Sequence, residues 1–162
     1  MAFDGIVIAN LAKELNHKLA DGRITKIAQT ESDKLLLTIK KSISSPEQKT
    51  IRTQNRLVIP VNPSLPLLYL TQENQNAPLQ APTFCMVLRK HLNNCKINLI
   101  EQIGLERVLC MHLEHLNEMG DYCRKKLYIE LMGKHSNIIF CDENDQIIDS
   151  IKHISALVSS VR

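Results

Sequence analysis

The segment YCRKKLYIELMGKHSNIIFCDENDQIIDSIK, residues 122–152, decides the fold class of this chain. It contains three apolar stretches: Tyr122 to Leu131, Asn137 to Cys141 and Gln146 to Lys152. Turn-like pieces separate them, one at Gly133 and one at residues 142–145. Short apolar stretches divided in this way are typical of antiparallel strands joined by hairpins. The segment therefore predicts an antiparallel sheet.

The same pattern extends toward the amino terminus. Stretches rich in β-branched residues or leucine predict further strands at Ile24–Gln29, Lys34–Lys40, Thr50–Thr53, Arg56–Val61, Leu67–Tyr69, Lys96–Ile103 and Glu106–Leu116. Roughly nine amphipathic strands must close or stack to hide their apolar faces. With two helices, they predict an α+β fold in which mostly antiparallel strands form a β-sandwich, as one domain over residues 1–162.

Two segments have helical periodicity. Asp4 is placed to cap a helix over residues 4–21, Gly22 to end it as the C′ residue, and Thr83 to cap a second helix. The expected apolar face of the first helix is Val7, Leu11, Leu15 and Leu19, widened by Ile8 and Ala12. That of the second is Phe84, Val87, Leu88, His91 and Leu92, with Arg89, Lys90 and Asn93 on another face.

Composition restricts the function only loosely. The chain has 44% apolar and 23% charged residues, as in ordinary soluble domains, and a net charge of +3 permits RNA binding without indicating it. An aromatic content of 4% argues against a surface that stacks several bases on successive rings. No signal peptide or membrane span is present, so a cytoplasmic location is expected.

Familiar catalytic and metal-binding patterns are missing from the sequence. The five glycines are not clustered, which excludes a phosphate-binding loop or dinucleotide fingerprint. His112 and His115 are three apart on a predicted strand, so they face opposite sides and cannot readily share a metal. The cysteines are expected to be buried, reduced thiols, not a disulfide framework or zinc site: Cys85, Cys95, Cys110, Cys123 and Cys141. No cofactor is predicted, and no nucleophile for covalent catalysis is evident.

Three polar groups remain as candidate contacts with RNA. In the segment Glu130–Asn137, Lys134, His135 and Asn137 supply donors suited to phosphate and sugar, although most polar turns only satisfy their own backbone. Adjacent charges occur at Glu106-Arg107, where the alternative is a solvated strand end. The pair Arg89-Lys90 is either a phosphate contact or a hydrated helix face.

Several motifs, in the same order along the chain, resemble the amino-terminal domain of the NFACT family. They are Phe3-Asp4-Gly5, Gly22-Arg23-Ile24, Phe84–Leu92, Gln102–Arg107, Glu130–Asn137 and Ile148–Lys152. The resemblance implies a fold similar to the amino-terminal domain of formamidopyrimidine-DNA glycosylases. It also implies that a helix-hairpin-helix segment, a coiled coil and a later domain of the full protein are absent from this fragment.

The resemblance implies a function as well. Similar proteins bind large ribosomal subunits obstructed by peptidyl-tRNA and recruit alanyl-tRNA for template-free alanine tailing of the stalled chain. The ribosome would make the peptide bond, so the domain is not expected to be an enzyme. An alternative is a surface adhesin that binds fibronectin, after an older family label. A glycosylase-like DNA-binding domain is less favoured, because Ala2 stands where those enzymes have their nucleophilic proline.

By resemblance, the functional positions of the family fall on Asp4 and on the pair Glu106-Arg107. The pair departs from the family's Asp-Arg, because the extra methylene of Glu106 moves the carboxylate by roughly one C–C bond. In the Glu130–Asn137 segment, Lys134 stands in the place of the family's arginine, which keeps the cation and loses the bidentate fork.

Overall fold

The computed structural model describes residues 5–31, 34–44, 50–61, 68–72, 81–104, 106–131 and 136–152. These residues form two helices and nine strands, which confirms the α+β class. The elements are α1 (Gly5–Leu19), β1 (Arg23–Glu31), β2 (Lys34–Ser44), β3 (Thr50–Pro60), β4 (Tyr69–Thr71), α2 (Thr83–Leu92), β5 (Lys96–Gln102), β6 (Val108–Leu116), β7 (Tyr122–Glu130), β8 (Asn137–Asp142) and β9 (Ile147–Ser150).

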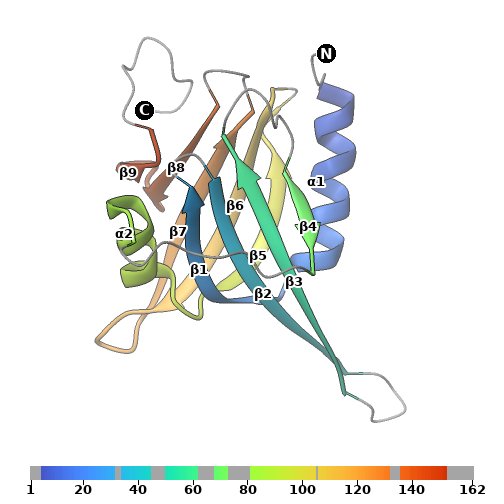
Figure 1. The fold of residues 1–162 in the computed structure, drawn as a ribbon. Helices are drawn as coiled ribbons and strands as arrows, with labels where there is room; N and C mark the ends of the chain where they lie inside the picture. The colour runs from blue at the N-terminus through green and yellow to red at the C-terminus, as the bar shows by residue number, and fades with distance from the viewer. Residues whose placement is uncertain are drawn as a thin grey trace.

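The strands form one continuous sheet in the order β4-β3-β2-β1-β5-β6-β7-β8-β9. Every neighbouring pair is antiparallel. The predicted sandwich is therefore corrected, because no break separates two layers among the described strands. The sheet instead curls around one core, with α1 and α2 at its two sides (Figure 1). A strongly curved sheet hides its apolar inner face as two stacked layers would.

The pairing between β1 and β5 has the fewest residue pairs in the sheet. Its ladder contains one residue pair, Arg23 opposite Lys96. Backbone hydrogen bonds beside it reinforce the contact, including Ile24 N to Cys95 O at 3.0 Å and Ile97 N to Gly22 O at 2.8 Å. The sheet can bend sharply here because few ladder bonds have to be kept.

The predicted apolar face of α1 is confirmed at four of its six residues and not at the other two. Ile8, Ala12, Leu15 and Leu19 are buried in the core, whereas Val7 is 40% exposed and Leu11 is only partly buried. Spacings of four, three and four residues match the helical repeat better than a strict repeat of four, which drifts around the helix.

The expected helix caps also need correction. Asp21, with φ 69°, takes the left-handed conformation after α1 that was expected at Gly22. Gly22 serves close packing instead, since a Cβ there would lie 2.8 Å from Cγ2 of Ile39. Thr83 is the first residue of α2, and the capping residue is Pro82, with no side-chain cap. Asp4 lies outside the described residues.

Two of the predicted strands are one strand. Thr50–Thr53 and Arg56–Val61 merge into β3, because Gln54 and Asn55 continue the ladder opposite Lys40 and Ile39. These polar residues looked like a break in the sequence, but a half-exposed strand tolerates them. The strand predicted from Glu106 begins instead at Val108.

Candidate nucleic-acid interface

The turn that carries Glu106 and Arg107 connects β5 to β6. Ile103 N donates to Val108 O at 2.9 Å, and Glu106 N donates to Ile103 O at 3.1 Å. Gly104 has φ 55°, the left-handed conformation that glycine adopts without strain. The backbone of this turn is therefore held from within, while the side chains of Glu106 and Arg107 are exposed.

Two of the predicted groups of RNA contacts, the Glu106-Arg107 pair and the Glu130–Asn137 segment, meet at this turn. Leu131 N donates to Arg107 O at 2.9 Å, which fixes the end of β7 against the charged pair. Glu130 lies opposite Val108 on one side and opposite Asn137 on the other. Sequence spacing does not indicate this contact, because 24 residues separate Arg107 from Leu131. Antiparallel pairing of β6 with β7 brings them together.

Asn137 is turned into the protein. It is 1% exposed, and its Nδ2 donates to Lys152 O at 3.0 Å. Its Oδ1 accepts hydrogen bonds from the backbone N–H groups of Lys152 and Ile138, at 3.0 and 2.9 Å. The proposed RNA contact at Asn137 stays untested, but these bonds give the side chain a structural task, which is to tie β8 to the residues after β9.

Lys152 links this region to the other half of the sheet. Its Nζ donates to Val61 O, directly after β3. The base of the Glu130–Asn137 segment is thus connected to both halves. Lys134 and His135, within that segment, lie outside the described residues, as does Asp4.

The two cations of α2 differ in their surroundings, although both side chains are exposed. The Nε of Arg89 donates to Ile27 O at 2.8 Å, so part of its guanidinium group holds α2 against β1. Lys90 forms no side-chain bond among the described residues. Of these two candidate RNA contacts, Lys90 is the one whose donors are uncommitted.

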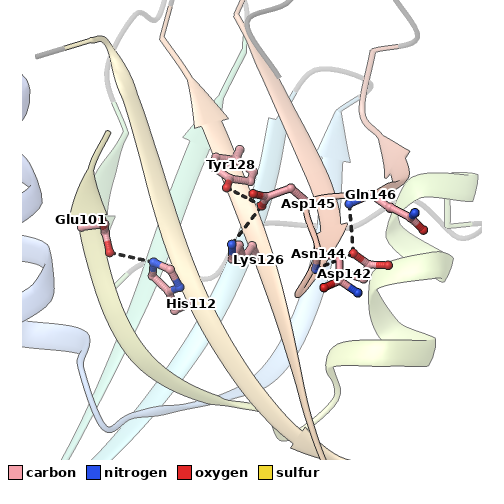
Figure 2. Close-up of polar contacts among 8 residues, drawn as sticks. All are labelled: Glu101, His112, Lys126, Tyr128, Asp142, Asn144, Asp145 and Gln146. Atoms are coloured by element: carbon pink, nitrogen blue, oxygen red, sulfur yellow. Dashed lines mark hydrogen bonds and ion pairs between the residues drawn. The ribbon is translucent and has the colours of Figure 1, made fainter. Parts of the chain in front are cut away.

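The outer face of β5, β6 and β7 carries polar pairs that the sequence analysis did not identify. His112 Nε2 lies 2.8 Å from Glu101 Oε2. Asp145 Oδ1 accepts hydrogen bonds from Lys126 Nζ at 3.0 Å and from the Tyr128 hydroxyl at 2.6 Å (Figure 2). Glu101 and His112 belong to the neighbouring strands β5 and β6, and a single sequence does not specify how two strands pair. Only the register of this pairing shows that the two side chains are neighbours.

Hydrogen bonding shifts the ionisation of this outer cluster. The bond from Tyr128 is the largest cause that lowers the pKa of the Asp145 carboxyl. Burial, followed by the bond to Asp145, raises the pKa of Tyr128 well above its usual range. At neutral pH, Tyr128 is therefore a hydrogen-bond donor to a charged carboxylate, and not a base.

The cysteine thiols have the environments of core residues. Cys85, Cys95, Cys110 and Cys141 are buried, which confirms the prediction for these four, and Cys123 is half-buried. Burial raises the pKa of Cys95 and of Cys110 to about 12. Among the described residues, no group of three His, Cys, Asp or Glu side chains is placed to hold a metal ion. No described helix has the length and apolar character needed to span a membrane.

Comparison with known proteins gives consistent matches. A family model described as NFACT N-terminal and middle domains matches residues 4–162. The Rqc2 homolog RqcH of Bacillus subtilis is 37% identical over 163 residues, which cover 100% of this chain and 27% of that protein. The Rqc2 homolog RqcH of Streptococcus pneumoniae is also 37% identical, and the match covers 100% of this chain and 28% of that protein. The chain thus spans about a quarter of the length of these relatives.

Solved structures share the fold. The N-terminal domain of fibronectin-binding protein PavA from Streptococcus pneumoniae matches with a TM-score of 0.82 and 36% identity, covering 95% of this chain and 55% of that one. The N-terminal part of the fibronectin/fibrinogen-binding protein from Streptococcus suis matches with a TM-score of 0.84 and 33% identity, covering 98% and 57%. The arrangement of strands and helices is thus one already seen by experiment.

Proposed function

This chain belongs to the NFACT family, whose Rqc2-homologue members are ribosome quality control factors, and we propose that it is the tRNA- and ribosome-facing module of such a factor. In this proposal it acts in the cytoplasm and helps to bring alanyl-tRNA to an obstructed large ribosomal subunit. The ribosome itself then extends the stalled chain with alanine. The module supplies position and not a catalytic group.

The observation that carries this proposal is the geometry of the turn at Glu106-Arg107. Its backbone is held by internal hydrogen bonds and by Leu131, so the two exposed side chains start from a fixed place. Arginine is suited to phosphate because its planar guanidinium group donates two parallel hydrogen bonds. The neighbouring carboxylate accepts hydrogen bonds from ribose hydroxyl or base amino groups. A cation and an acceptor side by side suit a folded RNA better than a cation alone.

The test expresses the natural gene product and its variants in cells from which the gene has been deleted. We expect Arg107→Ala and Glu106→Gln each to reduce alanine tailing of stalled nascent chains roughly tenfold or more, as for the loss of one charged hydrogen bond, while thermal unfolding stays as in the parent. Arg52→Ala and Glu118→Gln are matched controls, because they change an exposed arginine and an exposed glutamate on other parts of the surface. Unchanged tailing in both test variants would reject the role assigned to this pair.

Co-sedimentation tests the partner directly. The gene product should migrate with large ribosomal subunits, and the RNA recovered with it should include tRNA. If the protein migrates apart from ribosomal particles under conditions that stall translation, the proposed function is wrong.

A second candidate function comes from the names of the solved structures, which describe fibronectin- and fibrinogen-binding proteins. In that case the chain would be an adhesin. Cell fractionation distinguishes the two, since an adhesin is recovered at the cell surface and binds immobilised fibronectin, whereas a tailing factor is recovered with ribosomes.

A further inference from the structure

A pocket lies at the opposite end of β6 from the Glu106-Arg107 turn. Its volume is about 400 Å³, and it is lined by the start of β1, the residues that follow α2, the start of β5 and the facing ends of β6 and β7. The β6–β7 hairpin lies below α2, at the lower left of the view (Figure 1). Since β6 has nine residues, about 30 Å separates the pocket from the turn. The two places are therefore distinct.

The sheet register places a row of charges across this end of the outer face. Arg23 lies opposite Lys96, Lys96 opposite Glu114, and Glu114 opposite Arg124. Side chains of directly opposed residues share a face and are neighbours. Glu114 accepts a hydrogen bond from Asn98 Nδ2 at 3.3 Å, so its carboxylate is partly occupied. Three cations, against Glu114 and the Asp21 carboxylate beside Lys96, give this region an excess of positive charge.

Arg23, at the junction of β1 with β5, is held in place by a hydrogen bond. Arg23 Nη1 donates to Asn94 O at 3.0 Å, which orients the guanidinium group at the rim of the pocket. A guanidinium group has five N–H donors, so several remain for a ligand. Lys96 Nζ lies 3.6 Å from Asp21 in an exposed ion pair. Exposed pairs of this kind contribute little to stability and exchange readily for another anion.

An exposed aromatic ring stands beside these cations. Tyr122 is 74% exposed at the start of β7, and Leu116, directly opposite, is 58% exposed. Both line the pocket. Exposed aromatic rings beside cations are typical of surfaces that stack a nucleobase and bind its phosphate. The low aromatic content excludes a platform of several rings, but one base requires only one ring.

We propose that this pocket binds a single unpaired nucleotide of an RNA strand. Its base would lie against Tyr122, and its phosphate would be held by Arg23 and Lys96. The amides of Asn93 and Asn94, which also line the pocket, supply donors and acceptors for the base edge. This inference rests on the proposed function, because that function supplies the RNA, and it adds a contact about 30 Å from Arg107.

The test measures binding of a fluorescein-labelled single-stranded RNA of ten nucleotides to the natural gene product. Tyr122→Ala should weaken binding roughly 5- to 100-fold, as expected for the loss of one stacked base. Tyr122→Phe keeps the ring and should bind as the parent does. Removing the Arg23 or Lys96 cation by substitution with alanine should lower the slope of log Kd against log salt concentration by about 0.7 for each lost phosphate contact.

The matched control is Met119→Ala at the tip of the same hairpin, which is 85% exposed and outside the pocket lining. It should bind the RNA as the parent does. Binding by Tyr122→Ala within twofold of the parent would overturn the proposal, as would equal binding of a duplex with the same sequence. If instead Arg107→Ala abolishes tailing while Tyr122→Ala neither binds RNA less tightly nor tails less, the proposed function stands and this pocket is not an RNA site.

Discussion

The two ends of strand β6 present charge in different ways. At the start of β6, Glu106 and Arg107 project from a turn whose own backbone hydrogen bonds fix its place. At the far end, side chains from β1, β5 and the β6–β7 hairpin converge on a pocket. The first region depends on two neighbouring side chains whose backbone is hydrogen-bonded to Ile103 and Leu131. The second depends on shape, because its lining comes from β1, β5, β6, β7 and the residues after α2, which are far apart in the chain.

The largest expected effect concerns the hydrogen bonds of Asn137, which lies opposite Glu130 near the Glu106-Arg107 turn. Asn137→Ala removes three hydrogen bonds at a buried position and leaves backbone groups of Lys152 and Ile138 without their partner. We expect a loss of about 2–4 kcal/mol in the free energy of unfolding, measured by urea titration.

Asn144→Ala is the control, since that side chain is exposed, and it should change stability by less than about 0.5 kcal/mol. A loss for Asn137→Ala no larger than that of the control would show that β8 is not tied to the end of β9 by this amide.

The next prediction concerns the junction that shapes the pocket end. Gly22→Ala would place a Cβ 2.8 Å from Cγ2 of Ile39 and 3.0 Å from Leu19 O, and the backbone contact cannot relax easily. We expect a loss of about 1–3 kcal/mol in the free energy of unfolding. Asp21→Gly, at a left-handed residue, relieves strain and should be neutral or stabilising by up to ~1 kcal/mol. Equal destabilisation by both changes would argue against close packing as the role of Gly22.

A third prediction uses the histidines that face inward near the pocket end. Burial is the largest cause that lowers the pKa of both His91 and His115, and the positive charge of Lys125 acts in the same direction. The ring of His91 packs on Phe140 with centroids 5.6 Å apart. For His91, nearby Lys90 adds to the shift, and for His115 a bond to its neighbour's carbonyl opposes it.

The sign of the pH effect follows from these lowered values. Above the ordinary histidine pKa of about 6.5, both rings are neutral whether the chain is folded or unfolded, and their contribution to stability is complete. As the pH falls through that value the unfolded chain takes up protons first, so stability decreases until the pH falls below the lowered pKa values of the folded state. Urea midpoints between pH 8 and pH 5 measure this loss.

The histidine variants sharpen that measurement. His91→Gln and His115→Gln should each flatten the pH dependence, whereas His17→Gln, at an exposed position on α1, should leave it as in the parent. An equally steep decrease in both His91→Gln and His115→Gln would assign the acid sensitivity to other groups.

The smallest expected effect is at the tip of the hairpin. Met119 is 85% exposed, and the turn around it is held by the Asn117 side chain, which accepts hydrogen bonds from the backbone N–H groups of Met119 and Asp121 at 2.9 Å each. Met119→Ser should therefore change the free energy of unfolding by less than about 0.5 kcal/mol. A larger loss would mean that the tip packs on the body of the protein.

Much of the fold could be predicted from local patterns. Short stretches rich in apolar residues and separated by turn residues located β6, β7 and β8, because such stretches are visible in the local sequence. Prediction failed where polar residues stay inside a strand. Gln54 and Asn55 in β3 resembled a turn, and only their partners in β2 show that the strand continues.

The candidate site was predictable in its parts and not in its assembly. Glu106, Arg107 and the segment beginning at Glu130 each stood out by residue type. Their contact through Leu131 N and Arg107 O depends on pairing between β6 and β7. The pocket was missed because Arg23, Lys96 and Tyr122 are ordinary residues in their local sequences.

By itself, the sequence determined the α+β class, the order of the strands along the chain, the family resemblance and the burial of most of its cysteines. Each of these follows from residue type and short-range spacing, which a single chain records. Only the tertiary structure decided that the strands form one bent sheet, that Asn137 faces inward and that charges from β1, β5, β6 and β7 form a row. These features depend on strand register and on the curvature of the sheet. Both are set by apolar residues far apart in the chain that are buried together.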